Sequence, residues 1–249
     1  MGIDMSKMKA KLGAMNKKGS KDVFWRPKDG EQTLRILPVS DGDPFKEFWF
    51  HYNVGKSPGF LSLKKNFGED CPLDRFVKQL WSEGDEESVK MAKNLSARQR
   101  FFSPVLVRGE EDQGVKIWGY GKMAYQELLN LVLNPDYGDV TDVEDGTDLV
   151  ITYGKPAGAQ FPQTTITPRR RSSPLVEDKN KVSELLESIP DFSGLFEKKS
   201  YQDVQALLDE FLLGDDGDAE NASSEEVKYS NDSDKAKTSV DDAFAELLG

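Results

Sequence analysis

The stretch RQRFFSPVLVRGEEDQGVKIWGYG, residues 98–121, has the pattern of a β-hairpin. Two runs rich in aromatic and β-branched residues flank the polar connection EEDQ. Residues two apart in a strand project to the same face. A single Trp or Phe in a strand belongs to a core more often than not. Here, however, one face combines cations with rings, which predicts that it is not wholly buried: Lys116, Trp118, Tyr120 and Lys122.

The rest of the chain alternates between strand-like and helix-like patterns, which predicts a mainly β fold with added helices, of the α+β class. Further strands are predicted at 32–39, 45–52, 59–67, 148–155 and 159–167. Helices are predicted at 72–81, 86–95, 123–133, 181–189 and 200–212.

The formal net charge of −11 is concentrated in one segment. Residues 214–249 carry 11 acidic and 3 basic side chains, whereas the rest of the chain carries 33 acidic and 30 basic ones and is close to neutral. The composition of 214–249 predicts a disordered acidic tail. Its last residues combine acids with a small apolar patch, which we interpret as a docking peptide for protein partners: Asp241, Asp242, Phe244, Leu247 and Leu248.

Residues 1–21 are rich in lysine and contain no acid after Asp4. Met8, Leu12 and Met15 fall at helical spacing, so two interpretations stay open: a short amphipathic helix on a functional arm, or a frayed basic terminus. If the arm is functional, its cations are the candidates for contacts between neighbouring copies: Lys7, Lys9, Lys11, Lys17 and Lys18.

The sequence offers little for catalysis. His51 is the only histidine and Cys71 the only cysteine, so a nucleophile–base pair has few candidates. Glycine-rich phosphate loops are also missing, and we predict that the protein is not an enzyme. A single cysteine gives no intrachain disulfide framework, which fits a reducing compartment. Neither a membrane span nor a signal peptide is predicted.

His51, Cys71 and Asp74 are the only candidates for a metal site of the usual kind. A structural zinc site normally has four ligands, mostly sulfur and nitrogen. The CPLD segment has the spacing of a CxxC pair whose second cysteine is missing. We therefore expect a buried cysteine, a surface histidine, and neither a metal nor another cofactor.

Cations and aromatic rings occur together in several segments. Single-stranded nucleic acid needs such a surface, because bases stack on rings while cations follow the phosphates. The densest basic segment, RRRSS at 169–173, is a solvated loop, a phosphate site, or a site for an acidic segment of the same or a neighbouring molecule. The candidate DNA-binding residues are Lys56, Phe60, Lys64, Lys65, Phe67, Arg98, Arg100, Phe101, Phe102, Arg108, Lys116, Trp118, Tyr120, Lys122, Arg169, Arg170 and Arg171.

Several motifs, in this order, together resemble one family. They are the basic arm, LRILP (34–38), FHYN around His51, DCPL (70–73), RQRFFSPVLV (98–107), VKIWGYGK (115–122) and an acidic tail ending DDAFAELLG. The chain is similar to the helix-destabilising single-stranded DNA-binding protein of T-even-type bacteriophages, the gene 32 product family. The resemblance implies an OB-type five-stranded Greek-key barrel over 22–213, with an inserted helical subdomain at about 53–97.

The resemblance also implies roles for residues at matching positions. Members of the family hold a structural zinc with one histidine and three cysteines, and only His51 and Cys71 match, which implies that the zinc site is lost. The family's basic Ser/Thr-containing element, used in cooperative contacts, matches either KKGSK (17–21) or RRRSS. Stacking aromatics are implied at Phe101, Phe102 and Trp118, and more loosely at Phe60, Phe67 and Phe161. A positive cleft is implied at Arg35, Lys64, Lys65, Arg98 and Arg100.

We therefore predict cooperative, sequence-independent binding and protection of single-stranded DNA during phage replication, recombination and repair, in the cytoplasm of the infected bacterial host. The expected partners are single-stranded DNA, further copies of the chain along it, and phage replication and recombination proteins recruited by the acidic tail. The tail is also expected to compete with DNA for the cleft. Two alternatives stay open: an acidic adaptor that binds proteins without nucleic acid, and an RNA-binding OB protein.

Overall fold

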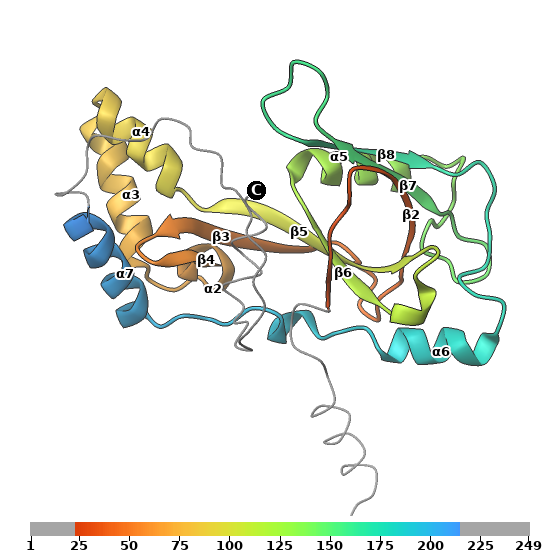
Figure 1. Ribbon diagram of the computed structural model, residues 1–249. Coiled ribbons are helices and arrows are strands. Elements are labelled where there is room, and N and C mark those ends of the chain that lie inside the picture. The colour runs from red at the N-terminus through yellow and green to blue at the C-terminus, as the bar shows by residue number, and fades with distance from the viewer. Residues whose placement is uncertain (1–22, 215–249) are drawn as a thin grey trace, which may run out of the picture.

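The computed structural model describes residues 23–214, which form a mixed α+β fold (Figure 1). The strands in this part of the chain are β1 (Phe24–Trp25), β2 (Gly30–Ile36), β3 (Lys46–Val54), β4 (Ser57–Leu61), β5 (Arg98–Val107), β6 (Lys116–Tyr120), β7 (Leu149–Gly154) and β8 (Gln163–Pro168). The helices are α2 (Leu63–Phe67), α3 (Pro72–Glu83), α4 (Glu86–Leu95), α5 (Lys122–Val132), α6 (Lys179–Glu187) and α7 (Tyr201–Gly214).

All eight strands belong to one sheet, with β5 near its centre. The main path runs β1-β6-β5-β2-β7-β8, and β3 pairs with β5 and with β4 outside this path. The first half of β5 pairs with β3, its middle with β6, and its last residues with β2. Among the described strands the path ends at β1 and β8, so the sheet is open and the expected five-stranded barrel is not shown.

Two lobes lie at the two ends of the long strands β3 and β5 (Figure 1). The helices α2, α3, α4 and α7 gather around the β3–β4 hairpin in one lobe, and β2, β6, β7, β8 and α5 form the other. After α6 the chain returns along the molecule to α7. The segment expected as an inserted subdomain, 53–97, thus lies in the helical lobe, where α7 joins it.

Each lobe has its own apolar core, and an aromatic cluster lies near the middle of the sheet. In the strand lobe, buried residues such as Leu34, Trp118 and Leu128 pack together. In the helical lobe, α3, α4 and α7 pack with the ends of β3 and β4. The aromatic cluster contains Phe50, Phe102 and, from the return segment, Phe192 and Phe196.

Local sequence signals explain most element boundaries. Pro72 begins α3, since proline is tolerated at a first helical position, and the left-handed Gly84 ends it. The Asp85 side chain accepts from the N–H of Ser88 and so begins α4, which has its predicted bounds. The strand predicted at 59–67 is wrong beyond Leu61, because the Ser62 side chain accepts from the N–H of Lys65 and caps α2 instead.

Gly119 of β6 lies directly against a buried ring. A Cβ atom at this position would lie 2.8 Å from Cε1 of Phe102, and Phe102 is itself 1% exposed among other aromatic rings. We expect Gly119→Ala to lower the free energy of unfolding by about 1–3 kcal/mol through overpacking, measured by urea denaturation. Gly154→Ala in β7 is the control, because nothing lies within 4 Å of its Cβ position. Equal stability of the two variants would contradict the packing.

Candidate nucleic-acid interface

The rings expected to form a stacking face are buried. Trp118 is 1% exposed and packs edge-on against Trp25, at 6.0 Å between ring centroids. The Tyr120 hydroxyl shares a hydrogen bond of 2.7 Å with Ser103 in the core. The exposure expected of this face is therefore wrong, because the strand-lobe core covers it. The other rings of this group are also buried: Phe60, Phe101 and Phe102.

Arg35 and Arg108 are not cations of an open cleft. Arg35 is fully buried, and its Nε donates to Asp148 at 2.9 Å. Burial lowers the pKa of Arg35, and the charge of Asp148 opposes this. Arg108 donates to both carboxylate oxygens of the same Asp148, at 3.0 and 3.1 Å. These arginines hold β2 and β5 to the start of β7, which corrects the expectation that Arg35 faces DNA.

The other predicted cations differ in their surroundings. Lys56 forms an ion pair with Glu210 of α7, at 2.5 Å. Arg100 and Lys116 are half-buried. The exposed ones are Lys64 and Lys65 of α2, Arg98 of β5, Lys122 of α5, and Arg169, Arg170 and Arg171 after β8.

Two half-buried rings lie on one face of the β3–β5 ladder. Trp49 pairs with Gln99, and Glu47 pairs with Phe101, so these four side chains share a face. Tyr125 of α5 stacks on Phe101, with 3.7 Å between centroids and 14° between ring planes. We call Trp49, Gln99 and Tyr125 the aromatic strip. Trp49 and Gln99 lie on the strands that connect the two lobes, and Tyr125 comes from α5.

Cations lie near the aromatic strip, and two further predicted rings are exposed. Lys65 of α2 lies over the Trp49 ring, with its Nζ 5.1 Å from the centroid. Lys122 is exposed in the first turn of α5, which also carries Tyr125. Phe161, 69% exposed, belongs to the loop between β7 and β8. The expectation of exposed rings thus holds for Phe161 and also for Phe67, which is 43% exposed under Lys198.

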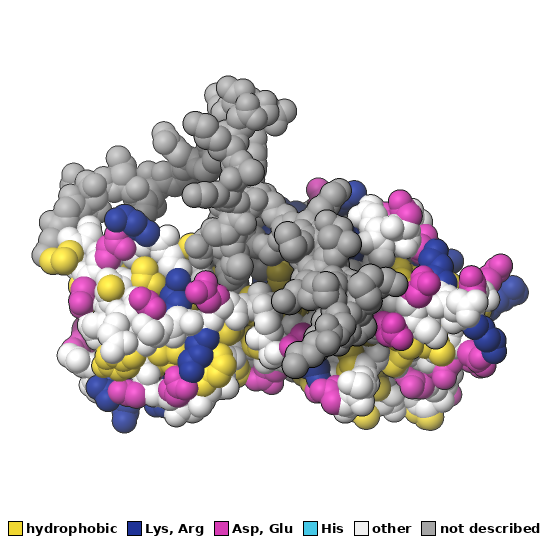
Figure 2. Space-filling view, turned by 90° about the horizontal axis from the view of Figure 1, so that it is seen from below, with side chains coloured by type: hydrophobic (Ala, Val, Ile, Leu, Met, Phe, Trp, Pro, Cys, Tyr) yellow, Lys and Arg dark blue, Asp and Glu magenta, His cyan; other side chains and the backbone are white. Residues whose placement is uncertain are grey.

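Acidic side chains lie close to the strip as well. Trp49 Nε1 donates to Glu47. Burial raises the pKa of Tyr125, and the charges of Asp43 and Glu47 raise it further. On the face drawn in Figure 2, basic and acidic side chains are interspersed over both lobes. The side chains visible on this face form no broad positive surface.

Sequence reasoning missed Trp49 and Tyr125. The alternation along β3 could have indicated that Trp49 is accessible. Trp49 shares its face of the strand with the charged Glu47, while Phe48 and Phe50 occupy the opposite face. Tyr125 had no such signal, since its position follows from how α5 packs on β5. The proposed cooperativity residues Lys7, Lys9, Lys11, Lys17 and Lys18 and the docking residues Asp241, Asp242, Phe244, Leu247 and Leu248 lie outside the described residues.

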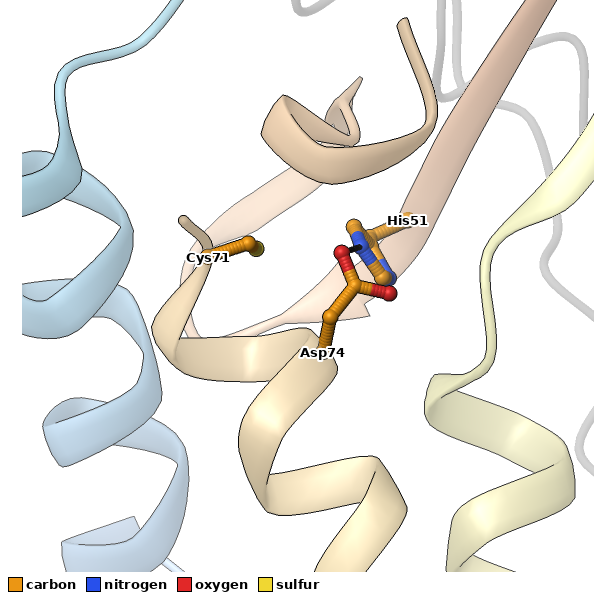
Figure 3. A group of neighbouring side chains, drawn as sticks. All are labelled: His51, Cys71 and Asp74. Carbon is orange, nitrogen blue, oxygen red and sulfur yellow. Dashed lines mark ion pairs between the residues drawn. The ribbon is translucent and has the colours of Figure 1, made fainter. Parts of the chain in front are cut away.

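His51, Cys71 and Asp74 point toward one another in the helical lobe (Figure 3). Their ligand atoms lie within 4.8 Å of each other. His51 is fully buried, not on the surface as expected, and its Nδ1–H donates to the Leu95 carbonyl at 2.8 Å. Its Nε2 lies 3.5 Å from Oδ2 of Asp74. Ser62, also fully buried, donates to the same oxygen at 3.0 Å.

This donor set does not fit the structural zinc site that the family resemblance implies. Only one of the donors is sulfur, and the cluster offers three ligand atoms where a structural zinc site normally has four. Burial alone would lower the pKa of His51, but the nearby Asp74 and Cys71 outweigh it and raise the pKa to about 9. When His51 is protonated, it forms a buried ion pair with Asp74 that joins β3 to α3.

The comparisons with known proteins agree with the resemblance. Residues 28–212 match a family described as gp32 DNA binding protein like. The chain belongs to this family. DNA is thus its partner at the level of the family, which is non-catalytic in general. No curated protein matches the chain. Among the described helices, none is long and apolar enough to cross a membrane.

The burial of Trp118 predicts a structural role. Trp118→Ala is expected to lower the free energy of unfolding by about 3–5 kcal/mol, because a large ring leaves a cavity in the core. Urea denaturation followed by circular dichroism measures this loss. Trp81→Ala in α3 is the matched control, because that ring is 47% exposed, and we expect a change within about 1 kcal/mol. A stable Trp118→Ala variant that has lost DNA affinity would contradict the burial.

The His51–Asp74 pair predicts a pH-dependent stability. The folded pKa of His51, about 9, exceeds the unfolded value near 6.5, so protonation favours the folded state. The contribution is complete below about pH 6.5 and is lost as the pH rises through about 9. Unfolding free energies of the wild type and of His51→Gln, measured from pH 6 to 10, should converge with rising pH. A constant difference between them would rule out the charged pair.

Proposed function

We propose that this member of the family binds single-stranded DNA without sequence preference, as a protein that coats the strand during replication, recombination and repair. The observation that carries the proposal is the aromatic strip on the strands between the lobes. Trp49 and Tyr125 offer faces to bases, and Lys65 and Lys122 offer charges to phosphates. A surface of stacking rings and nearby cations suits any base, because every base has a π-face.

The loop between β7 and β8 would supply a further contact. Phe161 is the most exposed aromatic ring among the described residues, and a large exposed ring on a loop is typical of a binding residue. We infer that it closes on bases held by the aromatic strip. Arg98, exposed at the start of β5, would follow the phosphates on the helical-lobe side.

Binding of this kind destabilises duplex DNA without ATP. A protein that binds the single strand and not the duplex shifts the melting equilibrium by mass action. Cooperative coating would come from contacts between copies, for which the lysine-rich residues 1–21 are the candidate, in the cytoplasm of an infected bacterial host. The acidic residues 214–249 would recruit replication and recombination proteins.

We also infer that the core is of the OB type. The strands β2, β5, β6, β7 and β8 would be its five members, with α5 between β6 and β7. The pairing of β2 with both β5 and β7 supports this correspondence, since a Greek-key barrel brings its first strand between two others.

The proposal is tested by titrating the full chain with oligo-dT while recording tryptophan fluorescence. We expect quenching at low salt and a steep loss of affinity as salt rises, because phosphate contacts release counterions. An acidic adaptor that binds only proteins would show no quenching. Competition between DNA and RNA oligonucleotides of the same length then distinguishes a DNA-binding from an RNA-binding protein.

Trp49→Ala tests the aromatic strip itself. We expect it to weaken oligo-dT binding by about 1–3 kcal/mol, the worth of one stacked base, which is roughly 5- to 150-fold in the dissociation constant. Fluorescence anisotropy with a labelled oligonucleotide measures the effect, and Trp81→Ala is the control on a distant exposed tryptophan. Equal affinities of the two variants would remove Trp49 from the interface.

A further inference from the structure

Glu47 lies beside both rings of the aromatic strip. It precedes Trp49 by two residues on β3, so the two side chains share a face of the sheet. Across the ladder Glu47 pairs with Phe101, and Tyr125 stacks on that ring. Side chains directly opposite each other in a sheet have Cβ atoms about 5 Å apart. The carboxylate therefore adjoins the two rings that would stack on bases.

Two interactions confirm this position. Nε1 of Trp49 donates to Oε1 of Glu47 at 2.5 Å, which holds the carboxylate at the edge of the indole ring. Burial raises the pKa of Tyr125, and the charges of Asp43 and Glu47 raise it further. The charge of Glu47 therefore acts on the tyrosine as well as on the tryptophan.

Most of the Glu47 carboxylate remains available to a ligand. The side chain is exposed, and within residues 23–214 no lysine or arginine forms an ion pair with it. A carboxylate has about four lone-pair positions, and the contact with Trp49 occupies one of them. The others accept hydrogen bonds, and a carboxylate donates none. Glu47 thus places a hydrogen-bond acceptor beside any base that stacks on either ring.

The chemistry of DNA decides what this acceptor would meet. A phosphate is unsuitable, because bringing like charges together costs free energy, and Lys65 and Lys122 offer phosphates a better position. Base edges are suitable, but they differ. Cytosine and adenine carry an amino group, N4 or N6, that donates hydrogen bonds, whereas thymine carries the acceptor O4. The N3–H of thymine lies between two carbonyls, so a carboxylate that accepts from it also meets their oxygens.

We propose that Glu47 is a specificity-determining residue, which favours cytosine and adenine over thymine at the nucleotide that stacks on the aromatic strip. This preference rests on the proposed function, since it requires that a base stacks on Trp49 or Tyr125. It is confined to that nucleotide. Elsewhere the binding stays independent of sequence, because phosphate contacts and stacking do not read the base edges.

A purely structural role for Glu47 has different consequences. If the carboxylate only held the Trp49 ring in place, its loss would weaken the binding of every oligonucleotide by the same factor. Glu47→Gln separates the two roles. The amide oxygen of glutamine still accepts from Trp49 Nε1, while its N–H groups donate to the carbonyls of thymine. The variant therefore keeps the ring in position and removes the discrimination between bases.

Fluorescence anisotropy of the full chain with labelled oligonucleotides of eight nucleotides tests the preference. One oligonucleotide contains only thymine and the other only 5-methylcytosine, which has the methyl group of thymine but an amino group in place of O4. At neutral pH and one salt concentration, we expect the wild type to bind the 5-methylcytosine strand about three- to tenfold more tightly. Glu47→Gln should bring the two affinities within about twofold. Equal affinities in the wild type, or a ratio that Glu47→Gln leaves unchanged, would overturn the proposal.

Asp43→Asn is the matched control for charge alone. Asp43 is exposed and its charge also acts on Tyr125, and the amide oxygen of asparagine can still accept from the N–H of Phe45. We expect this variant to keep the wild-type ratio of the two affinities. A ratio that falls as far as in Glu47→Gln would assign the discrimination to net charge and overturn the hydrogen bond. A wild type that binds neither strand contradicts the proposed function and with it the preference, whereas equal binding of both contradicts the preference alone.

Discussion

The central position of β5 is the constraint on which the rest of the structure depends. Neighbouring strands hydrogen-bond to both of its edges, β3 and β2 along one and β6 along the other. Its residues alternate between two faces, and both faces are covered by core. Phe101 consequently belongs to the strand-lobe core and Phe102 to the aromatic cluster at the middle of the sheet. Because both rings are buried, neither can be presented to a ligand.

The same constraint bears on the proposed DNA-binding surface. The apolar cores do not extend over the first residues of β5, Arg98–Arg100. These residues pair with β3 alone and belong to the connection between the lobes. Trp49 is half-buried at this end and is held by Lys65. Tyr125 of α5 is half-buried over Phe101, where β6 still pairs with β5. Each keeps part of its ring accessible. Rings fixed in this way lose little conformational freedom on binding, which favours affinity for a flexible single strand.

The fold was more predictable from sequence than the site. Helices followed from caps and breakers such as Pro72, Gly84 and Asp85, and strands from alternation, because these signals act over a few residues. The two-residue strand β1 was too short to show the alternation typical of a strand. The exposure of the aromatic rings was predicted wrongly. The alternation of side chains along a strand separates its two faces but does not show which face a core covers. Lysines flank Trp118, yet the core encloses it. Likewise, nothing near Arg35 indicates Asp148, its partner 113 positions later.

Each lobe contains one buried cation paired with a carboxylate from another element. In the helical lobe His51 of β3 meets Asp74 of α3, and in the strand lobe Arg35 of β2 meets Asp148 before β7. Such pairs gain little net stability over apolar packing, but losing one partner leaves a buried charge that costs about 3–5 kcal/mol. They therefore penalise any packing that separates the elements they join. If DNA binds on the strands between the lobes, as proposed, a pair in each lobe helps to fix the position of both lobes on β3 and β5 without adding charge to the surface that the strand would contact.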